Sequence, residues 1–163
     1  MKKLLLFLIF LHLLSCTSTI NKNEEFVNID CPLVFFSKEN NSFYKGNKNS
    51  FELEDVEYIA TLNNYSFNKP CLKNKKINYF SIDLLILVEQ INQIDNPLEL
   101  PLFVILYDEK RNVIERQYFK IKTNLFSYEI TDVNLIELVE NIDIVLNSKE
   151  QTSFVAFGFV NIK

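Results

Sequence analysis

The sequence contains a single histidine, only two glycines and no tryptophan among its 163 residues. The histidine, His12, lies in an N-terminal apolar segment that we expect to be removed from the mature protein. Without an imidazole, the mature chain lacks Ser-His and Cys-His nucleophiles, His-bound zinc and the commonest general base near neutral pH. Gly46 and Gly158 are too few and too isolated for a phosphate loop or a dinucleotide-binding fingerprint. We therefore expect no cofactor, no metal and no enzymatic activity.

Basic residues are also scarce. The chain has 17 Lys and Arg against 21 Asp and Glu, a formal net charge of −4, and its only arginines are Arg111 and Arg116. Proteins that bind nucleic acid usually cluster Lys and Arg on one face. Lys73, Lys75 and Lys76 do cluster, but so short a run is more typical of a solvated turn. The charge pattern therefore argues against a nucleic-acid partner.

The N-terminus follows the order of a secretory signal peptide: Lys2 and Lys3, an apolar run from Leu4 to Leu14, and the small residue Ser15. The apolar run is eleven residues long, whereas a helix needs about 20 to cross a bilayer. We therefore expect residues 1–15 to be a cleaved signal peptide and not a retained membrane span. The alternatives are an ordinary signal peptide followed by an incidental Cys16, and a cytosolic chain with an apolar start.

The residues Leu13-Leu14-Ser15-Cys16 resemble the lipobox of bacterial lipoproteins. The resemblance implies that cleavage precedes Cys16, that Cys16 is acylated, and that lipid holds the chain to a membrane of the cell envelope. Residues 16–30 are then the lipidated cysteine and a polar tether, whose length as a flexible coil is about 20 Å. The mature chain keeps 15 basic and 21 acidic residues, a formal charge of −6. Thr17 stands where an aspartate retains many lipoproteins in the inner membrane, which by analogy favours a periplasm-facing protein of the outer membrane.

Residues 31–163 are expected to form one all-β domain. Apolar residues recur at every second position in several short runs, which is the pattern of half-buried strands. The predicted strands are Leu33 to Ser37, Val56 to Leu62, Asn78 to Val88, Leu102 to Tyr107, Val113 to Ile121 and Phe154 to Ile162. A different spacing, in which Leu135, Leu138 and Val139 fall at helical intervals, predicts a short helical turn over 133–140, with a strand over 141–146. Short strands at regular spacing predict an immunoglobulin-like antiparallel β-sandwich with at most this one helical turn.

Two of these segments carry further signals. The polar loop Asp108 to Asn112 separates two apolar runs and predicts an antiparallel hairpin. Pro101 would start its first strand, because proline offers no donor to the ladder. Phe154 to Ile162 is apolar on both faces apart from Asn161, which predicts a central strand, and Gly158 within it predicts a bulge or a close approach of another group.

The mature body keeps two cysteines, Cys31 and Cys71. Export would place them in an oxidising compartment, where such pairs form disulfides. A bridge closing this loop of about 40 residues would stabilise the fold by about 4 kcal/mol in the chain-entropy model. The alternative is two buried thiols that are too far apart to bond. Two cysteines without histidine fall short of the four ligands of a structural zinc site.

Acidic residues crowd two segments: Glu52, Glu54, Asp55 and Glu57 in the first, and Glu137, Glu140 and Asp143 in the second. Two suitably spaced carboxylates can hydrolyse glycosides, but alternating acidic and apolar residues also form the solvated face of a strand, which we favour. Asp108, Glu109 and Asn112 could supply oxygens to a calcium ion, but the loop lacks the ligand spacing of a known calcium loop. A solvated turn is the expected structure there.

The order of short motifs along the mature chain resembles a family of small uncharacterised lipoproteins of Gram-negative bacteria. The motifs are Cys31-Pro32, Asp55-Val56-Glu57-Tyr58-Ile59-Ala60, Cys71, Leu100-Pro101-Leu102-Phe103-Val104 with Asp108 and Asn112-Val113, and Phe157-Gly158-Phe159. The resemblance implies a lipid anchor, a Cys31 to Cys71 pair and a β-sandwich, and it assigns no activity. Asn-rich loops around 40–49 are the main departure from the family pattern.

From these features we expect a lipid-anchored, non-catalytic module that binds another envelope protein or a cell-wall component. Two alternatives are a histidine-free hydrolase of cell-wall glycan that uses paired carboxylates, and an inhibitor of a lytic enzyme that acts through one protruding loop.

Overall fold

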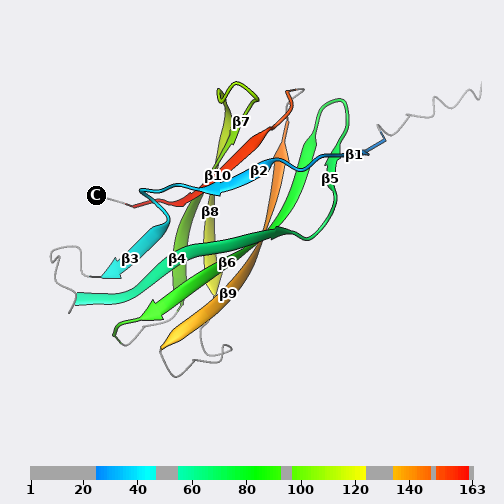
Figure 1. Cartoon of the computed structure of the whole chain (residues 1–163). Helices are drawn as coiled ribbons and strands as arrows, with labels where there is room; N and C mark the ends of the chain where they lie inside the picture. The colour runs from blue at the N-terminus through cyan, green and yellow to red at the C-terminus, as the bar shows by residue number, and fades with distance from the viewer. Residues whose placement is uncertain (1–24, 47–54, 93–96, 124–133, 148–149, 162–163) are drawn as a thin grey trace, which may run out of the picture.

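The computed structural model describes residues 25–46, 55–92, 97–123, 134–147 and 150–161. These residues form ten strands in two sheets that pack face to face as a β-sandwich (Figure 1), so the expected all-β sandwich is confirmed. The strands are β1 (Val27–Ile29), β2 (Leu33–Phe36), β3 (Ser42–Gly46), β4 (Val56–Phe67), β5 (Cys71–Lys73), β6 (Asn78–Gln90), β7 (Leu98–Tyr107), β8 (Val113–Thr123), β9 (Leu135–Leu146) and β10 (Phe154–Phe159).

The larger sheet is built around β6, the longest strand. Strands β4 and β5 pair with one edge of β6, β9 pairs with its other edge, and β3 and β1 extend the sheet beyond β4 and β5. The alternation predicted for β6 is confirmed, because Phe80, Ile82, Leu84, Ile86 and Val88 are all buried on one face. The second sheet has the order β2-β10-β7-β8.

Strand β9 corrects the prediction of a helical turn over 133–140. Residues 135–140 are extended, and β9 pairs with β6 along its whole length, from Asn78 opposite Leu146 to Glu89 opposite Leu135. The helical spacing misleads because Val139 and Val145 are exposed, while the buried Ile136, Leu138, Ile142, Ile144 and Leu146 follow period two except at Glu140. Residues 135–146 are extended because the edge of β6 pairs with all twelve of them and one face of the resulting strand is buried in the core.

The β7–β8 hairpin and the central position of β10 are both confirmed. However, β7 begins at Leu98, so Pro101 lies inside the strand and not at its start. The Val160 N–H donates a hydrogen bond to the Pro101 carbonyl (N–O 2.9 Å), one residue beyond the last β7–β10 pair. The carbonyl and the nitrogen of an extended residue point to the same side, so the missing donor of Pro101 falls where the ladder ends.

The N-terminal strands depart from the expected pattern in three ways. β1 forms within the stretch expected to be tether and pairs with β5, so the larger sheet starts at Val27. β3 forms within the segment expected to be an Asn-rich loop. β2 pairs with β10 in parallel, the one described pairing that is not antiparallel. A parallel pair needs a long connection, and β2 and β10 lie at opposite ends of the chain, so no hairpin turn dictates their direction.

The disulfide fixes the passage of the chain from one sheet to the other. Cys31 follows β1 of the larger sheet and precedes β2 of the smaller one, and the structure joins it to Cys71, the first residue of β5 (Cα–Cα 5.3 Å). The predicted pair of cysteines is thus brought together, and the alternative of two distant thiols is wrong.

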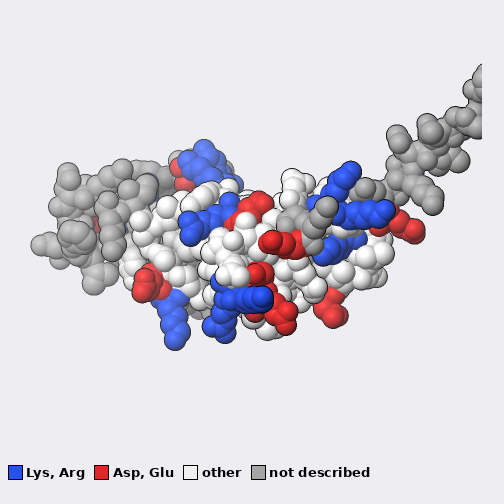
Figure 2. Space-filling view, turned by 90° about the horizontal axis from the view of Figure 1, so that it is seen from above, with Lys and Arg blue, Asp and Glu red and all other residues white. Residues whose placement is uncertain are grey.

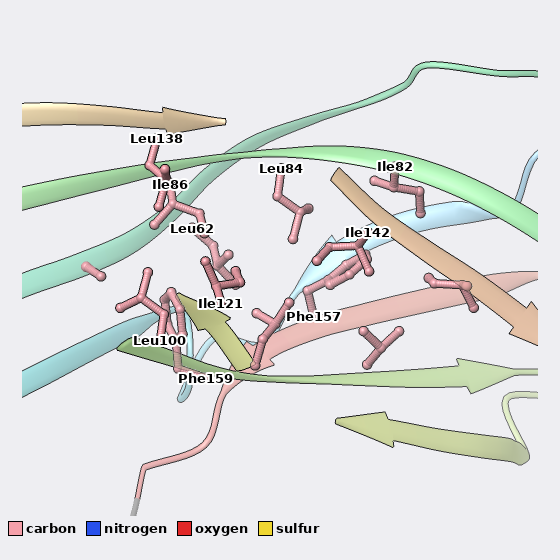
Figure 3. Packing of buried hydrophobic residues seen from close by; sticks show 14 of the residues in the cluster. Leu62, Ile82, Leu84, Ile86, Leu100, Ile121, Leu138, Ile142, Phe157 and Phe159 are labelled. Atoms are coloured by element: carbon pink, nitrogen blue, oxygen red, sulfur yellow. The ribbon is translucent and has the colours of Figure 1, made fainter. Parts of the chain in front are cut away.

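The core lies between the sheets. Figure 3 shows Ile82, Leu84 and Ile86 of the larger sheet pointing toward Leu100, Phe157 and Phe159 of the smaller one. Each large apolar side chain buried in this way stabilises the fold by about 1.5–3 kcal/mol. Tyr58 is also buried, and its hydroxyl donates a hydrogen bond to the Glu99 carbonyl (O–O 3.1 Å). Burial raises the pKa of Tyr58 to about 12.

Candidate functional site

Within the described residues, the three acids of the second acidic segment do not form a catalytic pair. Glu52 and Glu54 lie outside those residues. Glu137 and Asp143 face outward from β9 six positions apart, which separates them by about 20 Å along a strand. Glu140 points to the opposite face, where burial raises its pKa. Retaining and inverting glycosidases place their carboxylates roughly 5–9.5 Å apart, so these three acids do not form such a pair.

Asp143 belongs instead to a ladder of polar side chains across β6 and β9. Its Oδ1 accepts hydrogen bonds from the hydroxyls of Ser81 (2.6 Å) and Tyr79 (2.7 Å), which hold its pKa below the usual range. Asn141 donates to the Ser81 hydroxyl (3.2 Å) and to Asp83 Oδ1 (2.8 Å). These contacts join opposite or diagonally neighbouring residues of paired strands, so the ladder stabilises the register of the larger sheet.

The loop from Asp108 to Asn112, where the sequence predicted a solvated turn, is a turn stabilised by its own side chains. Asp108 accepts hydrogen bonds from the backbone N–H (2.7 Å) and the side-chain amide (2.8 Å) of Asn112. The amide contact is the main cause of a lowered pKa at Asp108. Within the described part of the chain, no three His, Cys, Asp or Glu side chains gather as metal ligands would. The structure thus uses the Asp108 carboxylate to close the hairpin.

The most unusual surface of the described domain is the outer face of the β2-β10-β7-β8 sheet. The core-facing positions of its strands alternate with outward positions that are also mainly apolar. These outward residues are Leu33 and Phe35 on β2, Phe154, Ala156 and Gly158 on β10, Phe103, Ile105 and Tyr107 on β7, and Arg116 and Tyr118 on β8. Leu33 is 66% exposed, Phe35 46% and Tyr118 70%. A contiguous exposed apolar surface of this kind usually marks an interaction site.

Two small residues of β10, Ala156 and Gly158, lie beneath larger side chains of the neighbouring strands. Ala156 lies opposite Phe35 of β2 and Ile105 of β7, and Gly158 lies opposite Phe103. A methyl group at Gly158 would lie only 2.4 Å from Cζ of Phe103, so the ring of Phe103 covers the glycine. The predicted close approach at Gly158 is therefore confirmed. Ala156 is only 3% exposed, between Phe35 on one neighbouring strand and Ile105 on the other.

A hollow of about 600 Å³ lies at the end of this face that carries the β7–β8 loop. Its lining comprises Leu33, Val34, Phe35, Tyr107, Arg111 and Phe154. The rings of Phe35 and Tyr107 stack with centroids 6.2 Å apart, and the Arg111 guanidinium lies 5.7 Å from the centre of the Phe154 ring. We call this site the Arg111 hollow. A smaller hollow of about 200 Å³ is lined by Phe103, Ile105, Arg116 and Tyr118.

Charge on the molecule is mixed. Figure 2 shows Lys and Arg interspersed with Asp and Glu over the face seen from above, with uncharged surface between them. On the outer face of the smaller sheet, the Glu99 carboxylate forms ion pairs with Lys120 (2.6 Å) and Lys122 (2.7 Å). These contacts lower the pKa of Glu99 to about 2. Neither arginine forms an ion pair with a carboxylate of the described residues. Each hollow therefore offers one guanidinium in a mainly apolar surround.

No sequence motif marks the residues of the Arg111 hollow as a site. A signal was present, because the segments Leu33 to Phe36 and Phe154 to Phe159 are apolar at outward as well as inward positions. Such runs in a two-layer sandwich leave one apolar face to the solvent. That these two segments lie side by side follows only from the parallel β2–β10 pairing.

Cys16 and the signal peptide lie outside the described residues. Within the part of the chain that the structure describes, we found no helix with the length and apolar character of a membrane span. Comparisons of the chain with protein-family models, with curated proteins and with solved structures found no match.

Proposed function

We propose that the protein is a lipid-anchored component of the bacterial cell envelope and that it acts as a non-catalytic binding module for another envelope protein. In this proposal Cys16 carries the lipid, residues 16–24 link the lipid to the domain, and the Arg111 hollow is the binding surface. The lipobox-like N-terminus supports the anchor. The exposed apolar lining of the hollow supports binding.

The observation that carries this proposal is the exposure of Leu33 (66%) and Phe35 (46%) beside a hollow of about 600 Å³. Small-molecule and anchor-residue sites are typically hollows of roughly 300–1,000 Å³ lined mainly by apolar and aromatic groups. Covering such side chains stabilises a complex by roughly 25 cal/mol per Å² of apolar surface removed from water, before the costs of association.

The chemistry of the lining favours binding over catalysis. The described residues that line the Arg111 hollow and the smaller hollow beside Arg116 include no carboxylate, thiol or aliphatic hydroxyl. Their polar groups are the two guanidinium groups and the phenol groups of Tyr107 and Tyr118. Tyr and Arg are the side chains that most often dominate the energetics of protein interfaces.

The same lining favours a protein partner over a cell-wall glycan. A sugar would place several hydroxyl groups on this surface, and each hydroxyl that lost water without a new partner would weaken binding by about 1–3 kcal/mol. Among the described residues that line the Arg111 hollow, only Arg111 and Tyr107 have side chains that form hydrogen bonds. An apolar side chain of another protein needs no such partners.

Site-specific crosslinking in cells tests this function. A photoreactive residue at Phe35 should crosslink to one envelope protein, and the yield should fall when Tyr107 is also changed to Ser. The matched control is a photoreactive residue at Val139, which is 61% exposed on the outer face of the other sheet. Equal products from both positions, or contacts between copies of this chain alone, would count against the binding face.

Labelling with a palmitate analogue tests the anchor separately. We expect incorporation into the full chain and none into the Cys16→Ala variant. Incorporation that survives this substitution would refute acylation of Cys16.

A further inference from the structure

Arg111 is held in place by the backbone of the β7–β8 loop. Its φ angle is 65°, in the left-handed region that residues other than glycine seldom adopt. Its N–H donates to the Asp108 carbonyl (3.1 Å), and the Asp108 N–H donates to the Asn112 carbonyl (3.0 Å). The side-chain bonds from Asn112 to Asp108 close the same turn. The start of the Arg111 side chain is therefore fixed relative to β7 and β8.

The guanidinium group is positioned at the hollow without a carboxylate partner among the described residues. It lies over the Phe154 ring, a cation–π contact that leaves the N–H donors at the edge of the group available to a ligand. Asp108 belongs to the same loop, but its two carboxylate oxygens accept hydrogen bonds from Asn112. The hollow thus presents one positive charge beside Leu33, Phe35 and Tyr107.

We propose that the Arg111 hollow recognises a protein segment in which a bulky apolar side chain lies next to a carboxylate. The apolar group packs on Leu33, Phe35 and Tyr107, and the carboxylate accepts hydrogen bonds from Arg111. This inference rests on the proposed binding function and adds the chemistry of the partner. A guanidinium is suited to the partner's carboxylate because its planar fork of donors matches two carboxylate oxygens.

The charges around the hollow favour a single carboxylate over an anionic lipid surface. Binding to anionic lipid needs several basic residues close together. The loop that carries Arg111 and Lys110 also carries Asp108 and Glu109, so it has no net excess of positive charge. Acids and bases are similarly interspersed over the surface in Figure 2. The single Arg111 guanidinium in a mainly apolar hollow therefore suits a partner segment with a single carboxylate beside an apolar side chain.

A pair of small probes tests this chemistry without knowledge of the partner. N-acetyl-phenylalanine carries an aromatic ring and one carboxylate, and N-acetyl-phenylalanine amide differs from it only in lacking the charge. Each is titrated into the mature chain from residue 16, carrying Cys16→Ser and labelled with ¹⁵N, while backbone amide shifts are followed by NMR. We expect dissociation constants of about a millimolar for such small ligands and binding of the acid about fivefold tighter than that of the amide.

Arginine substitutions locate the effect. Arg111→Gln should bring the affinity of the acid down to that of the amide and leave binding of the amide unchanged. Arg116→Gln is the matched control, because Arg116 lies on the same outer face but lines the other hollow, and it should preserve the fivefold preference. Shifted amides should cluster at Leu33, Phe35 and Tyr107.

Each other outcome overturns the proposal in a distinguishable way. Equal binding of the two probes, or no binding of either, removes the role of the carboxylate, while crosslinking at Phe35 still decides the binding function. Arg111-dependent binding to phosphatidylglycerol vesicles with no preference between the probes would assign the hollow to lipid. A dimer in sedimentation that Phe35→Asp abolishes would assign it to a second copy of the chain.

Discussion

Reduction of the Cys31–Cys71 disulfide should destabilise the domain strongly, because the bond closes a long loop. The two cysteines are 40 residues apart in sequence. In the chain-entropy model, a loop of that length lowers the entropy of the unfolded chain by about 13 cal/mol/K, which is about 4 kcal/mol at 25 °C. Most single domains have a total stability of only about 5–15 kcal/mol. The bond is therefore expected to supply a large share of the stability of this one.

The structural position of the bond adds a local effect. Cys31 lies between β1 and β2, where the chain passes from one sheet to the other, and Cys71 is fully buried at the start of β5. Strand β2 has only β10 as a backbone neighbour in the described sheet. Opening the bond should therefore loosen β2 first, and with it Leu33 and Phe35 of the Arg111 hollow.

Urea unfolding of the mature chain with Cys16→Ser, with and without reductant, measures this effect without creating a cavity. On reduction we expect the free energy of unfolding to fall by about 4 kcal/mol. In a parallel thermal unfolding experiment, the melting temperature should fall by roughly 15 °C. Hydrogen exchange should become faster at β2 amides before those of β6 change. The double variant Cys31→Ala/Cys71→Ala is the control and should not respond to reductant.

A difference below about 1 kcal/mol between the oxidised and reduced chains would refute the loop-closure reasoning. It would mean that the unfolded chain gains little freedom when the bond opens. Uniform acceleration of exchange in every strand would refute the separate prediction that β2 loosens first.

Three further predictions concern the core, the surface charges and the glycine of β10. Leu84→Ala removes a fully buried side chain and should lower the free energy of unfolding by about 2–5 kcal/mol, whereas the outward-facing Leu85→Ala should cost less than half of that in the same urea titration. The lysine contacts of Glu99 lower its pKa to about 2, so its contribution to the free energy of unfolding is fully present above its ordinary pKa and is lost as the pH falls toward 2. The difference in stability between wild type and Glu99→Gln should therefore be larger at pH 7 than at pH 2. A constant difference across this range would exclude the ion pairs as its cause. Gly158→Val should displace the Phe103 ring, since even a methyl group would lie 2.4 Å from Cζ of Phe103, and should lower the melting temperature; an unchanged melting curve would show that the ring moves aside at no cost.

The elements that the sequence predicted well are those whose pattern depends on one buried face. In β6 every second residue from Phe80 to Val88 is apolar and buried, and the hairpin of β7 and β8 is marked by its polar loop. A sandwich places one face of each strand in the core, so alternation is visible without knowledge of the neighbours. The pairing of the two cysteines was likewise predicted, because the N-terminus indicates export to an oxidising compartment.

Predictions failed where a neighbouring strand decides the conformation. Residues 135–140 have helical spacing, yet they are extended because the free edge of β6 pairs with them. β3 and β1 are short, with five and three residues, and they form strands because β4 and β5 offer them partners. β-propensity depends strongly on such surroundings, which are not visible within one segment of sequence.

The sequence by itself determined the all-β class, the buried faces of the long strands, the pairing of Cys31 with Cys71 and the lack of an imidazole in the body of the chain. Only the tertiary structure decided where a ligand could bind. Leu33, Phe35, Tyr107, Arg111 and Phe154 come from three strands and a loop, and they meet because β2 joins β10 in parallel and β7 lies on the other side of β10. Periodicity shows which side chains share a face of a strand. A hollow depends on which strands are neighbours, and here that is set by pairings between residues far apart in the chain, such as Leu33 with Phe154 and Tyr107 with Phe154.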